Sequence, residues 1–205
     1  HDYIVGCGAK PSFLGYGGFP GSACISINNE VIHGIPRSSK VIHKGDIVSV
    51  DVGALYNGFH GDTCATFPCG EISDEAKALL EVTEASLYEG IKAAKVGARL
   101  GDVCHAVEVY CASRGYGIVR NYCGHGIGRN LHESPEVPNY GEAGRGPRLT
   151  AGMTFCIEPM INVKGDEVKV LKDGWTVLTA SGSLSAHFEH TIALTSDGPV
   201  IMTRP

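Results

Sequence analysis

The segment GDIVSVDVGALYNGFHGDTCATF, residues 45–67, contains two stretches of mostly apolar residues joined at YNGF, residues 56–59. Asn-Gly is the pair that most strongly favours the tight turn of a β-hairpin, because that turn needs a positive φ at both positions. The segment is therefore predicted to form two antiparallel strands. Asp51 lies on the first strand and Asp62 on the second, each in an otherwise apolar context.

Part of this segment is similar to a later part of the chain, and we call this similarity the internal echo. IHKGDIVSVD (42–51) and LTAGMTFCIE (149–158) both place an aliphatic residue three positions before a glycine and an acidic residue six positions after it. Side chains alternate along a strand, so Asp51 and Glu158 each end an apolar strand on its less apolar face. The echo predicts an α+β fold with two pseudo-symmetric halves, each of helices packed on a curved antiparallel sheet. We expect a single domain over residues 1–205.

Two helices are predicted between the echoing strands. The first, over 73–97, has Ser73 as N-cap, acidic residues in its first turn and Gly97 beyond its end. Its predicted buried stripe consists of Ala76, Leu79, Leu80, Thr83, Leu87, Ile91 and Ala94. The second helix, about 100–114, should bury Val103, Ala106, Val107, Tyr110 and Cys111. His105 lies within it and is expected to be a surface or packing residue, since no acidic cluster adjoins it.

Composition limits the classes of function. The chain has 17 basic and 22 acidic residues and a formal charge of -5, so it lacks the basic surface of a nucleic-acid-binding protein. Its apolar runs are strand-length, and none resembles a membrane span or a signal peptide. The eight cysteines are scattered without paired spacing, so we expect them to be reduced and mostly buried. A soluble, cytoplasmic protein is predicted.

The segment GHGIGRNLHESP, residues 124–135, carries His125 and His132 seven positions apart. A helical zinc motif would need two histidines at i and i+4, so this is a different arrangement. Because three glycines surround His125, we predict a loop from which the two histidines reach one site from different directions.

Four acidic residues, Asp51, Asp62, Glu158 and Glu189, lie in apolar strands with no basic residue interleaved. Burying unpaired carboxylates costs several kcal/mol each unless cations compensate them. Two divalent cations would compensate all four carboxylates. With His125 as a neutral ligand, the donor set suits manganese, iron or cobalt and also admits zinc.

Six segments in order resemble one known family. They are NEVIHGIP (29–36), VDVGALYNGFHGDT (50–63), CGHGIG (123–128), LHESP (131–135), IEPM (157–160) and FEHT (188–191). Together they resemble the type I methionine aminopeptidases, which belong to the M24 metallopeptidases and have the pita-bread fold. The resemblance covers nearly the whole chain. It implies an enzyme that removes the N-terminal methionine from nascent proteins and peptides, with a preference for a small second residue.

The resemblance also assigns roles. It implies that the ligands of two metal ions are Asp51, Asp62, His125, Glu158 and Glu189, with Asp62 and Glu189 bridging. His33 and His132 resemble the family's catalytic histidines, which lie near the metals without binding them. Metal ions lower the pKa of a bound water, which then attacks the scissile carbonyl. Glu158 is expected to carry its proton, and the α-amine of the substrate is expected on the Asp51 side.

The substrate pocket implied by the resemblance is largely aromatic. Its members are Phe13, Tyr16, Phe19, Cys24, His33, Leu131, His132 and Trp175. Relatives often carry a cysteine or small residue at Phe13, a histidine at Gly17 and an aromatic residue at Leu131, so the shape of this pocket departs from the usual pattern. The chain also looks N-terminally shortened relative to the family.

Other interpretations make further predictions. A proline-directed aminopeptidase would share the five ligands but usually carries a separate N-terminal domain. A metal-free binding module on the same scaffold would normally have lost ligands, and a purely structural protein would not concentrate unpaired acids. A serine nucleophile is disfavoured because no G-x-S-x-G occurs, and no cysteine lies in a nucleophile motif.

We expect a monomer that acts on nascent chains, with the ribosome as a partner. The histidines left as structural are His43, His60, His187 and His190.

Overall fold

The computed structural model describes residues 1–204 and is built around one large antiparallel sheet. The two longest strands, β4 (Ile47–Tyr56) and β5 (Phe59–Pro68), pair along their whole length. The turn between them has positive φ at both Asn57 and Gly58. The predicted hairpin is therefore confirmed, together with the physical reason for it.

The large sheet has the order β1-β4-β5-β14-β9-β7-β8, with β2 beside β4 and β15 beside β14. Its other strands are β1 (Lys10–Pro11), β2 (Cys24–Ile27), β7 (Gly124–Gly126), β8 (Glu133–Val137), β9 (Thr154–Ile157), β14 (Glu189–Thr195) and β15 (Gly198–Ile201). The central pair is β5 and β14, with Cys64 opposite Glu189. On either side of this seam lie β4 and β9, the strands that carry the two copies of the sequence echo. The prediction of two corresponding halves is borne out at this level.

Two small sheets complete the structure. One has the order β13-β10-β6, from β13 (Ser185–His187), β10 (Met160–Asn162) and β6 (Gly117–Ile118). The other has the order β11-β12-β3, from β11 (Val168–Val170), β12 (Val177–Thr179) and β3 (Glu30–Ile32).

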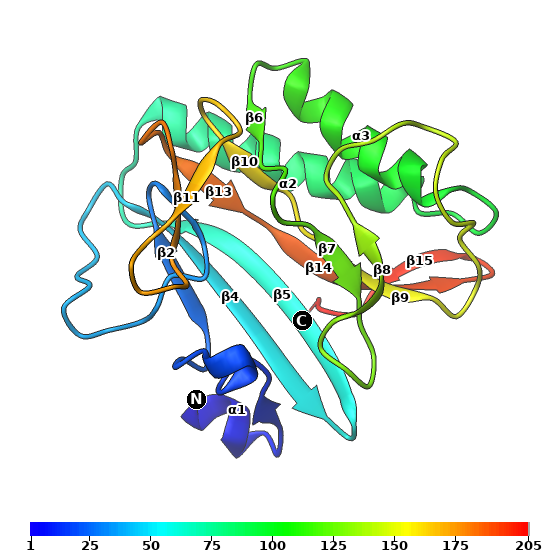
Figure 1. Cartoon of the computed structure of the whole chain (residues 1–205), viewed down its shortest axis with the longest axis horizontal. Coiled ribbons are helices and arrows are strands. Elements are labelled where there is room, and N and C mark those ends of the chain that lie inside the picture. The colour runs from blue at the N-terminus through cyan, green and yellow to red at the C-terminus, as the bar shows by residue number, and fades with distance from the viewer. Residues whose placement is uncertain (205) are drawn as a thin grey trace.

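The helices α2 (Asp74–Ala93) and α3 (Leu100–Ala112) lie side by side along one side of the large sheet (Figure 1). The hydroxyl of Ser73 accepts a hydrogen bond from Ala76 N at 3.1 Å, as an N-cap should. α2 ends at Ala93, earlier than predicted, and Gly97 instead uses its N–H to bond Leu149 O. The structure also contains a short helix, α1 (Asp2–Gly6), and a 3-10 turn, η1 (Tyr16–Gly18).

Most of the predicted helix stripes form the core. Leu79 of α2 and Val107 of α3 are fully buried and pack with Phe155 and Ile157 of β9. Leu80 was predicted to be buried but is only half-buried. Similarly, Ala106 and Tyr110 of the α3 stripe are half-buried, while Cys104 takes a core position. His105 is exposed on the helix surface, as predicted.

The eight cysteines are all free thiols, as expected. Five of them are buried, namely Cys24, Cys64, Cys104, Cys111 and Cys156. Within the part of the chain that the structure describes, no helix has the length and apolar character needed to cross a membrane.

The segment at 124–135 corrects one prediction. His125 lies on the strand β7, which pairs with β8, so this part is not a loop, whereas residues 127–132, with His132, form a loop between the two strands as predicted. The glycines of β7 serve close packing. A Cβ at Gly124 would lie 2.3 Å from Cys156 O, and one at Gly126 would lie 2.2 Å from Ser134 O. Only glycine lets these backbones approach so closely, which is why a strand here has the composition of a flexible loop.

Candidate metal centre

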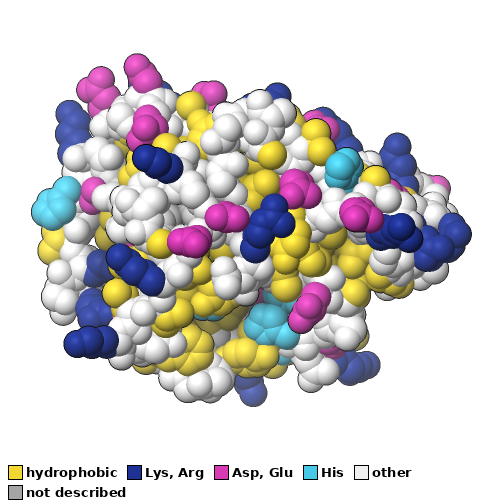
Figure 2. All heavy atoms as spheres, turned by 45° about the horizontal axis from the view of Figure 1, so that its top comes forward, with side chains coloured by type: hydrophobic (Ala, Val, Ile, Leu, Met, Phe, Trp, Pro, Cys, Tyr) yellow, Lys and Arg dark blue, Asp and Glu magenta, His cyan; other side chains and the backbone are white. Residues whose placement is uncertain are grey.

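The predicted site residues all line one cavity of about 210 Å³. The residues that line it include Phe13, Tyr16, Phe19, Cys24, His33, Asp51, Asp62, His125, Leu131, His132, Glu158, Trp175 and Glu189. Figure 2 shows apolar and histidine side chains gathered around a hollow on one face of the molecule. Residues from position 13 to position 189 therefore meet in a single place.

The four carboxylates reach the cavity from separate strands. Asp51 lies on β4 and Asp62 on β5, Glu158 follows β9 directly, and Glu189 begins β14. Three buried carboxylate oxygens have no hydrogen-bond partner, namely Asp51 Oδ1, Asp62 Oδ1 and Glu189 Oε1. Neither lysine nor arginine occurs among the residues that line the cavity. Buried carboxylate oxygens without partners are the chemistry of a site for cations, so the residues present fit divalent metal ions.

The pKa values of these four carboxylates are raised, as expected for acidic groups that have no positive charge beside them. Burial raises the pKa of Asp51, Glu158 and Glu189 well above the usual range, and neighbouring carboxylates raise each of them further. Burial also raises the pKa of Asp62, to about 7. The protein alone therefore holds protons on Asp51, Glu158 and Glu189 at neutral pH and leaves Asp62 partly protonated, and a bound cation would displace these protons.

His125 on β7 is prepared to act as a ligand. Its Nδ1–H donates to Gly126 O at 2.9 Å, because a carbonyl oxygen can only accept. The lone pair is therefore on Nε2, which lies 3.9 Å from Asp62 Oδ2 and 3.7 Å from Glu158 Oε1. Burial lowers the pKa of His125 to about 4, so the imidazole is neutral at neutral pH. A neutral imidazole with a fixed free nitrogen is what a metal ion requires.

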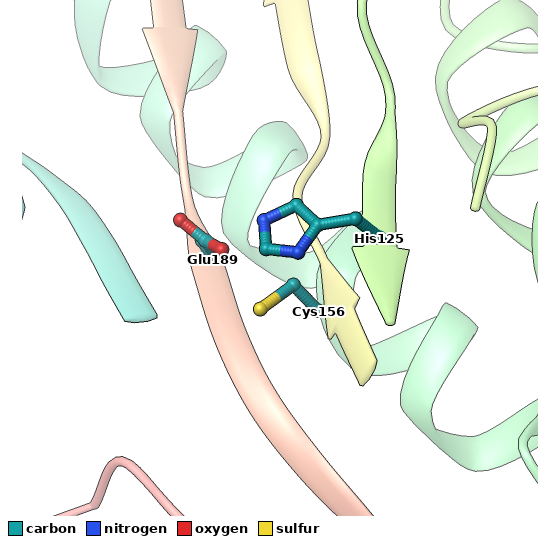
Figure 3. A group of neighbouring side chains, drawn as sticks. All are labelled: His125, Cys156 and Glu189. Atoms are coloured by element: carbon teal, nitrogen blue, oxygen red, sulfur yellow. The ribbon is translucent and has the colours of Figure 1, made fainter. Parts of the chain in front are cut away.

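Cys156 was not predicted as a possible ligand. Its sulfur, one nitrogen of His125 and one oxygen of Glu189 all lie within 4.8 Å of one another. Figure 3 shows these three side chains pointing toward one another from β9, β7 and β14. The signal was present in the sequence, because Cys156 precedes Glu158 by two positions and so shares its face of the strand.

His33 and His132 line the same cavity as the carboxylates but are not among the predicted metal ligands. His33 has a φ of 57°, an uncommon conformation for a residue with a side chain, and one that is often found at functional sites. Its ring meets Tyr122 and Trp175 edge-on, and burial lowers its pKa to about 4. The His132 ring centroid lies 4.1 Å from that of His125.

The four histidines left as structural have different surroundings. His187 is fully buried, and its Nε2 has no hydrogen-bond partner and lies 3.7 Å from Glu158 Oε2. His190 turns to the opposite face of the sheet and bonds Thr203, as strand alternation predicted. His60 bonds Ser12 Oγ at 2.8 Å, and His43 is exposed. Sequence reasoning missed the position of His187, although it lies two residues before Glu189.

The apolar end of the cavity contains the aromatic residues expected there. Phe13, Phe19, Cys24 and Leu131 form a buried cluster with Ile127 and Cys156. Trp175 packs edge-on against Phe19, with ring centroids 5.2 Å apart. The cavity thus joins an apolar pocket to a cluster of metal-ligating groups.

A buried cluster of carboxylates and a neutral imidazole, opening into a substrate-sized pocket, defines a metal-dependent hydrolase. The sequence profile of metallopeptidase family M24 matches residues 6–196, and the chain belongs to this family. Members of the family use divalent metal ions.

Curated relatives match almost the whole chain. It is 54% identical to the methionine aminopeptidase of Clostridium acetobutylicum over 202 residues, which are 98% of this chain and 81% of the relative. It is 53% identical to methionine aminopeptidase 1 of Bacillus subtilis, with the same coverage.

Solved structures agree with these relatives. The methionine aminopeptidase of Thermotoga maritima superposes with a TM-score of 0.98 at 47% identity, covering 100% of this chain and 82% of that one. The prolidase of Pyrococcus furiosus superposes with a TM-score of 0.70 at 25% identity, covering 89% of this chain and 49% of that one. The pita-bread fold that the sequence predicted is therefore confirmed.

Proposed function

We propose that this chain removes methionine from the amino terminus of peptides and nascent proteins that have a small second residue. One observation carries the proposal: a single cavity holds the five-residue donor set, His33 and His132, and an apolar aromatic pocket. The identity of over 50% to named methionine aminopeptidases supports it.

In this proposal two divalent ions, manganese, iron, cobalt or zinc, are held by Asp51, Asp62, His125, Glu158 and Glu189. Asp62 and Glu189, on the neighbouring central strands β5 and β14, would offer carboxylates to both ions. When bound, the ions supply Lewis-acid activation of water and of the scissile carbonyl.

The residues around the ions act on the substrate. Glu158, between His125 and the buried His187, holds a proton and transfers it to the departing amine. His33 and His132 stabilise the charge that develops on the carbonyl oxygen and orient the peptide. The substrate amine lies on the Asp51 side, so a blocked amine has no place to bind.

The apolar pocket selects the first side chain. Methionine is unbranched, and its sulfur gains roughly 0.3 to 1.5 kcal/mol at an aromatic edge. Phe13, Phe19 and Trp175 supply such edges. A lysine or glutamate side chain would bury an unpaired charge there.

The cellular setting is also part of the proposal. Eight free thiols suit a reducing compartment, so we place the enzyme in the cytoplasm, acting as a monomer on nascent chains near the ribosome. Sedimentation of the purified protein and of ribosome mixtures tests these two points.

A peptide panel tests the reaction. Peptides with Met, norleucine, Leu, Ala or Lys in the first position, followed by Ala-Ser, are assayed for release of the first residue. Acetylated peptides and Ala-Pro peptides are included. We expect rapid release of Met, moderate release of norleucine and no cleavage of acetylated peptides. Equal rates for Leu or Ala, or a preference for Ala-Pro, would replace this proposal with a broader or a proline-directed peptidase.

A further inference from the structure

We propose that Tyr16 is a positioning residue that keeps the ring proton of His132 on Nε2, so that His132 donates a hydrogen bond into the cavity. The proposal rests on the proposed function, because it assigns Tyr16 a role within that reaction. It concerns His132 Nδ1, the ring nitrogen that contacts Tyr16.

The contact is short and long-range in sequence. Tyr16 Oη lies 2.8 Å from His132 Nδ1, although the residues are 116 positions apart. The two ring centroids are 5.1 Å apart and the rings are tilted by 42°. A phenol hydroxyl is a more acidic donor than an imidazole N–H, and an imidazole nitrogen accepts better than a phenol oxygen. The favoured arrangement is therefore Tyr16 O–H donating to Nδ1.

His132 has only one ring proton to place. At pH 8, well above the ordinary imidazole pKa of about 6.5, the ring carries a single proton. In a neutral imidazole one nitrogen donates and the other accepts. If Nδ1 accepts from Tyr16, the proton is on Nε2, which forms no hydrogen bond with any of residues 1–204. Nε2–H is then available to a substrate oxygen.

The neighbouring His125 shows the opposite choice. Its Nδ1–H donates to the carbonyl of Gly126, which leaves its Nε2 as a lone pair. Two rings with centroids 4.1 Å apart thus carry their protons on different nitrogens. The hydrogen-bond partner of Nδ1 determines which nitrogen carries the proton. A carbonyl oxygen beside His125 leaves its Nε2 free to bind a cation, and a hydroxyl beside His132 leaves its Nε2–H free to donate.

The backbone holds Tyr16 at this position. Tyr16 begins the turn η1, where Tyr16 N bonds Phe13 O at 3.0 Å and Gly15 N bonds Phe19 O at 2.8 Å. Gly17 has a φ of 56°, and a Cβ there would lie 3.3 Å from Trp175. The turn therefore lies close to Trp175 in the pocket wall, and its backbone hydrogen bonds place the Tyr16 side chain beside His132.

The position of the proton can be measured directly in the metal-free protein. Long-range proton–nitrogen correlation spectra of protein with ¹⁵N-labelled histidine distinguish the two tautomers, and the spectrum of His132→Gln assigns the signals of His132. We expect the Nε2–H form in the wild type. In Tyr16→Phe, which keeps the ring and removes only the hydroxyl, the Nδ1 signal should shift toward that of a mixture of tautomers. Tyr140→Phe is the control, since its hydroxyl bonds Arg120 O at 3.4 Å and is absent from the lining of the cavity.

Kinetics with the metal-loaded enzyme and a Met-Ala-Ser peptide give the second readout. Loss of a full oxyanion donor costs about 10²- to 10³-fold in kcat, so a misplaced donor should cost about 10- to 100-fold, with little change in KM. An Nδ1–H wild type, an unchanged tautomer in Tyr16→Phe, or a change in KM alone would overturn the proposal. A wild type with the expected tautomer that leaves Met peptides intact would refute the proposed function instead.

Discussion

At the scale of single residues, the site is defined by groups that lack partners. Asp51, Asp62 and Glu189 each leave a carboxylate oxygen buried and unbonded. Nearby, His33 and His132 have a pKa lowered by burial, and both lie outside the proposed ligand set. A cation satisfies the first group, while the second remains available for binding and hydrogen bonding. Substitutions in the two groups should therefore separate metal content from turnover.

The first prediction concerns Glu158→Gln and His33→Ala. Both should fold and lose most activity, but Glu158→Gln should also lose bound metal, since it removes a charged ligand. His33→Ala should keep its metal and lose about 10²-fold in kcat, as expected for removal of a group that stabilises the transition state. Elemental analysis and kinetics on the same preparations measure both effects. The matched control is His105→Ala, on the exposed surface of α3. Equal metal loss in both site variants would place His33 among the ligands.

The second prediction concerns pH and the metal-free protein. Carboxylates with a raised pKa hold protons that the unfolded chain has released, so they lower stability as pH rises. Buried histidines with a lowered pKa act in the opposite sense, but only below their ordinary value of 6.5. Above pH 6.5 the carboxylates remain, and near pH 9 the buried thiols with a raised pKa act in the same sense, so stability should fall from pH 6.5 toward pH 9. Urea unfolding at a series of pH values, with and without manganese, measures this. A stability that rises across this window without metal would contradict the assigned protonation.

At the scale of elements, β7 depends on contacts that sequence patterns cannot express. Gly124→Ala would place a Cβ 2.3 Å from Cys156 O, between β7 and β9. We expect a loss of about 1 to 3 kcal/mol of stability from overpacking, with weaker metal binding because His125 is displaced. Gly61→Ala is the matched control, since it is also a strand glycine and a Cβ there meets nothing within 4 Å. Denaturation and metal titration of the two variants should differ, and equal stability would show that β7 can shift freely.

Local patterns predicted the elements whose causes are local. Asn57-Gly58 indicated the hairpin and Ser73 indicated the start of α2, since turn and cap chemistry act over a few residues. The pairing of β5 with β14 joins residues more than a hundred positions apart, such as Cys64 and Glu189, and no local pattern indicates it. The ligand set itself was predicted from unpaired acids and from family motifs.

What the sequence concealed depends on the fold as a whole. The glycines around His125 have the composition of a loop, because neither close strand packing nor the lack of space for a Cβ is visible in a sequence. Likewise, His187 comes within 3.7 Å of Glu158 only because β13 pairs with β10. Residues that act through such contacts need coordinates to be found.

At the scale of the molecule, bound metal should link the two halves and stabilise the folded state. The donors come from β4, β5, β7 and β14 and from the residue after β9, so binding requires the whole large sheet. An ion that binds only the folded state at 100 times its Kd adds about 2.7 kcal/mol. For a chain of this size that corresponds to a rise in Tm of roughly 5 to 10 °C. Calorimetry with increasing manganese or cobalt measures it, and a Tm independent of metal would argue against a shared site.

The seam between β5 and β14 also imposes an order of events during synthesis. A chain that emerges from its N-terminal side presents Asp51 and Asp62 long before His125, Glu158 and Glu189 exist. Until β14 is made and paired, the first two carboxylates belong to an open edge with no complete set of donors. A partly made chain therefore cannot hydrolyse anything, and the competence to cut peptides arrives in one step, when the last of the central strands is in place.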